Sequence, residues 1–242
     1  MQKIYLIMFT LALILPACGV QATPVATESA PAPEATALET VNIPTLEPTQ
    51  APAPTNTEQS TTPGVATYRI VAGESRLQYE VGEVFLNQNN RFNVAVGVTT
   101  QISGDIQVDL AEPQKSNLGP ITADISQFTS DNNRRDNALR DRFIESRLFP
   151  NVTFVAREIS GLPASYQEGQ LVPLQISGDL TIRETTRPVT FEATVTIAAN
   201  TLTGEATTTI LMSDFGFGPI DIIGILKTED EAKISLSFVA RP

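Results

Sequence analysis

Histidine is absent from the 242-residue sequence, and cysteine occurs once. Without an imidazole, the chain cannot form Ser-His-Asp or Cys-His nucleophilic sites, histidine-ligated zinc or a histidine general base. The inward faces of the later strands described below also hold no carboxylate or lysine. These absences predict no catalytic residue, no metal site and no cofactor, and they indicate that the protein is not an enzyme.

The one cysteine, Cys18, ends the run LPAC at residues 15–18, directly after the short apolar stretch 4–15. Lys3 precedes that stretch, which is too short to span a bilayer as a permanent helix. The pattern predicts a lipoprotein signal peptide over residues 1–17 and acylation of Cys18. The mature protein would then be anchored to a membrane on its extracytoplasmic side, in the periplasm or at the cell surface. The alternative is a secretory signal with an incidental or buried thiol.

Basic residues are scarce, because 16 Lys and Arg stand against 27 Asp and Glu, which gives a formal net charge of −11. Residues 1–66 contribute one lysine and five glutamates, so the remainder carries −7, from 15 cations and 22 anions. Such a surface repels nucleic acid and anionic lipid headgroups. The sequence therefore predicts no nucleic-acid partner and membrane attachment through N-terminal acyl groups.

Residues 18–66 contain no aromatic ring and are rich in Pro, Thr, Ala and Glu, with eight prolines. This composition cannot bury a core and favours extended, solvated conformations. We expect a disordered linker over 18–66, followed by one domain over 67–242. With Cys18 acylated, that domain has no disulfide, so its stability depends on a packed core.

Period-two alternation dominates residues 67–242. The clearest strand covers 189–197, where apolar residues occupy every odd position and polar residues every even position. Residues 174–182, 202–210 and 234–240 repeat the pattern. The pattern predicts an all-β fold of about eight antiparallel strands. Closing the sheet into an elongated barrel would remove its edges and leave room for one small ligand.

One stretch breaks the alternation. Residues 129–133 (TSDNN) supply N-cap residues, and residues 134–144 follow at helical spacing. Asp136 stands four residues before Arg140, which predicts an exposed ion pair on the helix surface. The expected fold is therefore an antiparallel barrel with one short helix.

Three groups of motifs follow one another along the domain. They are RDNALR at 135–140 with FPNVTF at 149–154, GDLTIRETTRPV at 178–189, and SDFGF at 213–217. This set resembles the signature of the YceI-like family, in which an RDxHLR-type helix leads into an FPxxxF strand; Ala138 stands where that family usually has histidine. The resemblance implies a lipocalin-like barrel that holds an apolar chain, such as a polyisoprenoid, a quinone tail or a fatty acyl derivative.

The family resemblance and the apolar inward faces together predict an elongated hydrophobic tunnel. The alternative for each aromatic ring is that it simply fills a core, which is the usual fate of such residues. The side chains that we expect to line the tunnel are Leu139, Phe143, Phe154, Phe191, Phe215 and Phe217.

Arg135 is the candidate for contact with a ligand headgroup. It lies four residues before Leu139 and hence on the inward face of the helix. A buried arginine needs a partner, and the guanidinium suits either a core carboxylate such as Asp214 or a phosphate or other acidic headgroup. The sequence leaves both alternatives open.

Residues 218–226 are unusually apolar for a connection between strands. They could cover the mouth of the barrel, pack as an irregular strand or touch a membrane. The sequence does not decide among these three roles.

Two functional hypotheses follow. The first is a membrane-anchored, extracytoplasmic carrier or binding protein for a polyisoprenoid, a quinone or a related lipid. The second is a structural or stress-related envelope protein with a solid barrel, which acts through protein partners. The two differ in whether the barrel is hollow, and either protein could be a monomer or a homodimer.

Overall fold

The computed structural model describes residues 64–242. The predicted signal peptide, Cys18 and nearly all of the predicted linker lie outside the described residues. The first strand begins at Val65.

Within residues 64–242 the strands form one sheet of fourteen members, and all their pairings are antiparallel. The strands are β1 (Val65–Ile70), β2 (Arg76–Phe85), β3 (Arg91–Thr99), β4 (Ile102–Ser103), β5 (Asp105–Asp109), β6 (Asn117–Leu118), β7 (Ile121–Asp124), β8 (Thr129–Ser130), β9 (Asn151–Ser160), β10 (Val172–Ile182), β11 (Thr185–Ala198), β12 (Thr201–Leu211), β13 (Asp221–Ile222) and β14 (Leu226–Arg241).

Helical turns in the described residues are short. One is α-helical, one is π-helical (η4), and the others are 3-10 helices. They are η1 (Leu86–Gln88), η2 (Pro113–Lys115), η3 (Ile125–Gln127), α1 (Asn133–Ala138), η4 (Leu139–Phe143) and η5 (Met212–Phe215).

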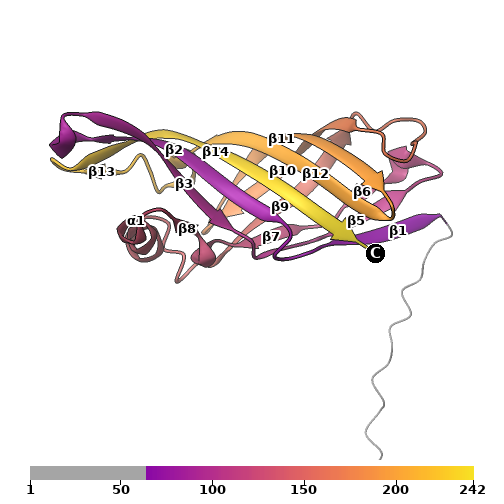
Figure 1. Ribbon diagram of the computed structural model, residues 1–242, viewed down its shortest axis with the longest axis horizontal. Coiled ribbons are helices and arrows are strands. Elements are labelled where there is room, and N and C mark those ends of the chain that lie inside the picture. Colours follow the sequence, from indigo (N-terminus) through magenta and orange to yellow (C-terminus); the bar gives the residue numbers. More distant parts are fainter. Residues whose placement is uncertain (1–63) are drawn as a thin grey trace, which may run out of the picture. The chain divides into compact units, whose positions relative to one another are not determined.

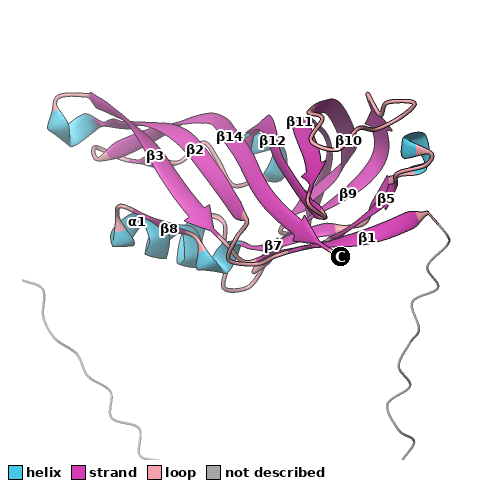
Figure 2. Ribbon diagram, turned by 45° about the vertical axis from the view of Figure 1, so that its right-hand side comes forward, coloured by secondary structure: helices cyan, strands magenta, loops and turns pink. Residues whose placement is uncertain are grey.

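The sheet curls into a half-barrel (Figure 2). Neighbours follow the order β7, β9, β10, β11, β12, β14, β1 and β5. The short strands β4 and β5 belong to one stretch of chain, in which β4 pairs with β7 and β5 pairs with β1. This stretch joins the two margins of the sheet. The predicted all-β, elongated antiparallel barrel with one short helix is confirmed, in the form of a curled antiparallel sheet that makes a half-barrel.

The alternation in the sequence fixes which side chains face the inside of the curl. Along β11, Phe191, Ala193 and Ile197 are buried, whereas Glu192 and Thr194 are exposed. The partner strands β10 and β12 follow the same rule, because paired residues point to the same face of the sheet. The inner face therefore collects the apolar residues of every long strand.

The helical segment follows β8 and lies beside it (Figures 1 and 2). Asn132 is the N-cap, and its Oδ1 accepts hydrogen bonds from the backbone N–H groups of Arg134 (2.9 Å) and Arg135 (3.3 Å). The helix changes to π-helical geometry at Leu139 and ends at Phe143. The predicted helix is therefore present, and its last part is π-helical.

The predicted exposed ion pair between Asp136 and Arg140 is wrong. Asp136 is buried and accepts hydrogen bonds from the backbone N–H (3.1 Å) and the hydroxyl (2.6 Å) of Ser130. Arg140 donates to the carbonyl oxygens of Ser126 and Phe128, both at 2.8 Å. Because the helix packs against β8 and the chain before it, both side chains find partners there instead of pairing with each other.

The GDLTIRETTRPV and FPNVTF motifs meet just after the helical segment ends. Arg183, in the turn between β10 and β11, forms an ion pair with Glu145 at 2.5 Å. Its guanidinium also lies over the ring of Phe149, 5.7 Å from the centroid. The contact ties the exit of the helical segment to the β10–β11 hairpin and so fixes how the helix covers the sheet.

Candidate functional site

A cavity of about 690 Å³ lies inside the curl of the sheet. This volume falls within the range of about 300–1,000 Å³ that is typical of ligand pockets. Apolar side chains from the inner faces of the long strands, from the short strands and from the helical segment form most of its wall. Examples from the sheet are Val81, Leu174, Leu180, Ile210 and Leu236.

The interior of the curl is hollow. Four aliphatic residues line the cavity but are only partly buried, although other inward residues of the same strands, such as Leu174, Ala193 and Ala232, are buried. The four are Ile176, Val195, Ile234 and Leu236. In a close-packed interior such side chains would contact other side chains on all sides. Their exposure arises because they face empty space inside the sheet.

The structure brings five of the six predicted tunnel residues to the cavity wall. Phe154 and Phe191 meet edge to face, with ring centroids 5.0 Å apart. Phe215 does not line the cavity, since it is 2% exposed and lies behind Phe217, with centroids 6.5 Å apart. The predicted residues at the wall are Leu139, Phe143, Phe154, Phe191 and Phe217.

Part of the wall comes from residues that the sequence analysis did not single out. Strand β2 contributes Leu77, Tyr79, Val81 and Glu83 to the cavity, and β3 contributes Ala95. The alternation of Leu77, Tyr79 and Val81 was a usable signal for an inward face. Glu83 continues the same alternation, which therefore also placed a carboxylate on the inward face of the strand.

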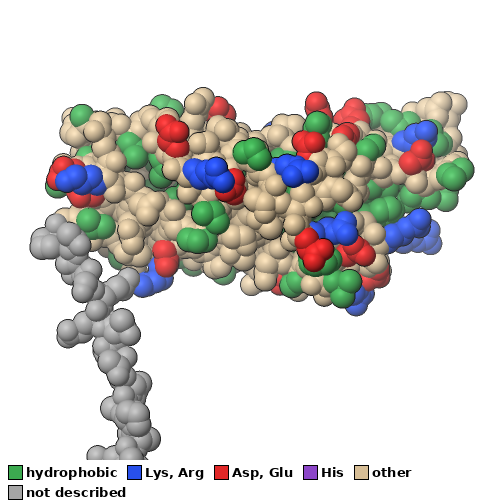
Figure 3. Space-filling model, turned by 180° about the vertical axis from the view of Figure 1, so that it is seen from behind, with side chains coloured by type: hydrophobic (Ala, Val, Ile, Leu, Met, Phe, Trp, Pro, Cys, Tyr) green, Lys and Arg blue, Asp and Glu red, His purple; other side chains and the backbone are tan. Residues whose placement is uncertain are grey.

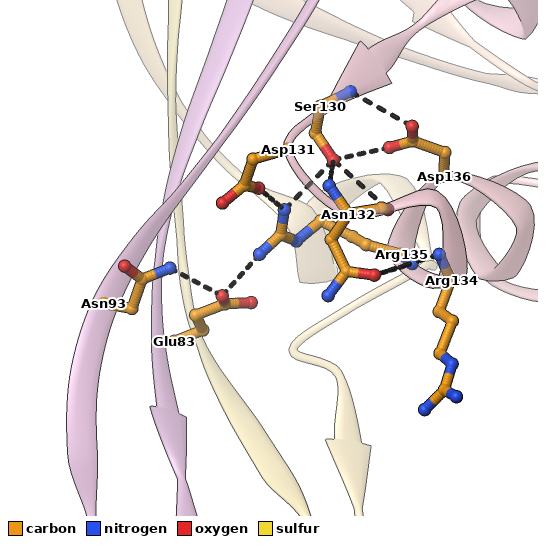
Figure 4. Close-up of polar contacts among 8 residues, drawn as sticks. All are labelled: Glu83, Asn93, Ser130, Asp131, Asn132, Arg134, Arg135 and Asp136. Atoms are coloured by element: carbon orange, nitrogen blue, oxygen red, sulfur yellow. Dashed lines mark hydrogen bonds and ion pairs between the residues drawn. The ribbon is translucent and has the colours of Figure 1, made fainter.

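Arg135 lies at the cavity wall and is held by an ion pair that the sequence did not predict (Figure 4). Its Nη2 donates to Oε1 of Glu83 at 2.6 Å, and the side chains are 14% and 3% exposed. Asn93 donates to the same carboxylate oxygen at 2.8 Å. The partner is therefore a core carboxylate, one of the two alternatives, but it is Glu83 and not Asp214, which is exposed in η5.

Three segments position this polar cluster. Glu83 and Asn93 face each other across the β2–β3 pair, while Ser130 ends β8 and leads into α1. The Nη1 of Arg135 donates to Ser130 Oγ at 3.0 Å and to Asp131 Oδ1 at 2.5 Å. The guanidinium thus bridges the sheet and the start of the helix (Figure 4).

The electrostatics of the cluster keep Arg135 charged. Burial disfavours the charged guanidinium, but the hydrogen bonds to Glu83 and Asp131 outweigh it, so the pKa of Arg135 lies above its usual value. The hydrogen bond from Arg135 in turn lowers the pKa of Asp131. Two carboxylates therefore compensate the charge of Arg135, and Arg134 is a second arginine that lines the cavity.

Tyr79 lies between the cavity and this cluster. Its ring meets Phe128 edge to face at 5.1 Å, and its buried hydroxyl has no hydrogen-bond partner among the described residues. Burial raises the pKa of Tyr79 to about 12, and the nearby charge of Arg135 offsets only part of this effect. The phenol is therefore neutral at physiological pH.

Residues 64–242 contain no group of three or more Asp, Glu, His or Cys side chains that could hold a metal ion. Over the same residues, no helix has the length and apolar character that crossing a membrane requires.

A curled antiparallel sheet with an apolar internal cavity and one covering helix defines a β-barrel-like protein with a ligand-sized interior. The YceI-like domain model matches residues 68–240, and the chain belongs to that family. The resemblance in the sequence motifs is thereby confirmed. No curated protein matches the chain significantly in sequence.

Two solved structures illustrate the similarity of fold. Burkholderia cenocepacia BcnA superposes with a TM-score of 0.54 at 21% identity, over 70% of this chain and 98% of its own. A polyisoprenoid-binding domain from Saccharophagus degradans, implicated in plant cell wall breakdown, superposes with a TM-score of 0.52 at 12% identity, over 72% and 97%. At these identities the likeness concerns the fold.

Proposed function

We propose that the protein binds and carries an apolar, chain-like molecule, a polyisoprenoid, a quinone or a related lipid. The observation that carries this proposal is the cavity of about 690 Å³ with its largely apolar wall. Membership of the YceI-like family and the likeness to a polyisoprenoid-binding domain support it. A solid structural barrel, the alternative hypothesis, would not leave inward-facing aliphatic side chains partly exposed.

The energy available from such a ligand is sufficient without strong polar contacts. Each buried CH₂ group contributes about 0.8 kcal/mol, so two isoprene units offer about 6–8 kcal/mol before the costs of association. Those costs are several kcal/mol, and further units inside the cavity offset them. A chain of three or four units would therefore bind with useful affinity.

For the polar end of the ligand, we propose a place beside Arg135. The guanidinium already contacts Glu83 and Asp131, and these two carboxylates balance Arg135 and Arg134, which also lines the cavity, so the local charge is not positive. A phosphate would meet two carboxylates there, whereas a hydroxyl or a carbonyl oxygen would not be repelled. The cluster thus favours an uncharged oxygen-containing headgroup, such as that of a polyprenyl alcohol, phenol or quinone.

The cellular setting of the proposed function comes from the sequence alone. We propose that the chain is processed before Cys18, acylated there and held at the extracytoplasmic face of a membrane. Labelling with a fatty acid should mark the wild-type protein and not the Cys18→Ser variant. A wild-type protein that takes up no label and remains in the soluble fraction would contradict the anchoring.

Mass spectrometry of an organic extract of the purified full-length protein tests the ligand class directly. We expect an apolar chain with a hydroxyl or carbonyl headgroup, enriched over an extract of an unrelated protein prepared in the same way. A phosphorylated chain would contradict the headgroup assignment. Only bulk phospholipid, in the same amount as in the control, would contradict the proposed function.

A further inference from the structure

One end of the domain carries two neighbouring hairpins with apolar turns. The β2–β3 turn and the β13–β14 turn lie side by side, since Leu226 pairs with Phe85 and the N–H of Leu86 donates to the carbonyl of Ile225 at 2.8 Å. Both turns project at the left in Figure 1. We refer to residues 84–95 and 217–227 together as the apolar tip.

The apolar tip exposes large hydrophobic side chains to solvent. Ile223 is 93% exposed, Phe92 56%, Ile225 48% and Val94 45%. These four are nearly half of the nine large hydrophobic residues that are exposed in residues 64–242. Single exposed apolar residues are normal, but a cluster on adjacent hairpins marks an interaction surface. Figure 3 shows the same end from behind, at the right, with apolar side chains gathered on it.

The charge of the apolar tip differs from that of the rest of the domain. Its charged residues are Arg91, Asp221 and Lys227, which sum to +1, whereas residues 64–242 together carry −7. Asp221 and Lys227 form an ion pair at 3.1 Å. The acidic surface repels anionic lipid, and the residues of the tip do not add to this repulsion.

The apolar tip is continuous with the cavity. Phe85, Ile222, Ile225 and Leu226 belong to the tip and also line the cavity wall. An apolar ligand that moves between a bilayer and the cavity at this end would pass along hydrophobic side chains and avoid water.

We propose that the apolar tip docks on a lipid bilayer, and that the cavity is loaded and emptied at this contact. The loading step rests on the proposed function, whereas the docking does not. A bilayer fits this surface better than a protein partner, because a stable protein interface needs about 800 Å² on each side, and two narrow turns offer a few protruding side chains instead. Apolar side chains accompanied by a cation are typical of segments that enter the lipid interface.

Fluorescent reporters on the full-length protein test the docking. Cys18→Ser leaves the chain without cysteine, so a single environment-sensitive label can be attached at Ile223→Cys. The matched control is Leu171→Cys, an exposed apolar position just before β10, whose start lies at the opposite end of the sheet. All variants keep the same N-terminal segment, so any tethering to the membrane is common to them.

The labelled proteins are mixed with vesicles of phosphatidylcholine and phosphatidylglycerol that contain brominated phosphatidylcholine as a quencher. We expect the label at position 223 to shift to shorter wavelength and to be quenched severalfold, and the label at position 171 to stay unchanged. With the reporter moved to Phe92→Cys, adding Ile223→Asp should raise the lipid concentration needed for half-maximal quenching about tenfold, since burial of an isoleucine contributes at least that factor to the affinity. Equal responses at positions 223 and 171, or no response at 223, would overturn the proposal.

A transfer experiment separates this inference from the proposed function. A fluorescent polyprenol is supplied either in detergent micelles or in the same vesicles. Ile223→Asp should bind the probe from micelles as the wild type does, because Ile223 does not line the cavity, and should take it up from vesicles at least severalfold more slowly. Equal uptake rates from vesicles would overturn loading at the tip, even if binding is intact. If the tip contacts vesicles but no probe binds from micelles, the docking stands and the proposed function fails.

Discussion

At the scale of single residues, Tyr79 is the clearest departure from a well-satisfied interior. Its buried hydroxyl lacks a hydrogen-bond partner among residues 64–242, and such a group costs about 1–3 kcal/mol. Tyr79→Phe should therefore raise the free energy of unfolding by about 1 kcal/mol in urea denaturation. Tyr166→Phe is the control and should lower it by about as much, since that hydroxyl donates to the carbonyl of Ile197 and accepts from its N–H, both at 2.7 Å.

The same residue makes stability depend on pH in the alkaline range. The folded-state pKa of Tyr79 is about 12, above the value of about 10 in the unfolded chain. The unfolded chain releases the proton first, so this contribution is complete below pH 10 and is lost as the pH rises from 10 through 12. Between these pH values the wild type should lose about 2 kcal/mol more than Tyr79→Phe. Denaturation of both proteins at each pH measures these free energies of unfolding. Equal losses in the wild type and in Tyr79→Phe would contradict the assignment.

The buried pair of Glu83 and Arg135 also makes a residue-scale prediction. Removing one partner leaves the other charge poorly compensated, so Glu83→Ala should lower the free energy of unfolding by about 3 kcal/mol. Replacing both partners with apolar residues, Glu83→Leu with Arg135→Met, should recover most of this loss. A double variant that is as unstable as the sum of the single variants would show that the pair is not coupled.

At the scale of elements, the sequence predicted the phase of the strands well. Alternation reports which side chains share a face, so the inner faces of β10, β11, β12 and β14 were predictable. The partner of Arg135 was not, because Glu83 is 52 residues away in sequence and reaches it only through the placement of β2 beside the helix. The burial of Asp136 against Ser130 was missed for the same reason. Helical spacing shows which residues share a face of the helix, but it does not show which segment packs against that face.

The helix that carries Arg135 depends on its cap. Asn132 satisfies two N–H groups at the start of α1, so Asn132→Ala should lower the free energy of unfolding by about 1 kcal/mol. Asn133→Ala is the matched control on the adjacent exposed residue and should have little effect, because alanine is a good helix former. Thermal denaturation of the two variants compares them; equal melting temperatures would contradict the capping role.

At the scale of the whole domain, the family and the curled sheet followed from the motifs and the alternation, whereas the sequence suggested a hollow interior but could not decide between a hollow and a filled one. Whether a barrel is filled depends on its curvature and on the summed volumes of side chains from many strands, neither of which is local in sequence. Phe215 shows the difficulty: it belongs to the SDFG motif beside Phe217, yet only Phe217 reaches the cavity. A sequence pattern identifies apolar residues, but it does not distinguish those that line the cavity from those that fill the core.

Adding bulk to the inner wall distinguishes a hollow interior from a filled one. Ala193 and Ala206 pair across β11 and β12, and both line the cavity. Tryptophan at either position should therefore occupy cavity space with a loss of stability well below the 1–3 kcal/mol that overpacking a filled core costs. Thr207→Trp, on the exposed face of the same strand, is the control for the substitution itself.

The most direct test of the account is a titration of the delipidated protein with a fluorescent polyprenol. We predict saturable binding by the wild type and by Thr207→Trp, and at least tenfold weaker binding by Ala206→Trp, with the melting temperatures of all three proteins similar. Absence of saturable binding by the wild type, together with strong destabilisation by Ala206→Trp, would contradict the claim that the curled sheet encloses a lipid-binding cavity.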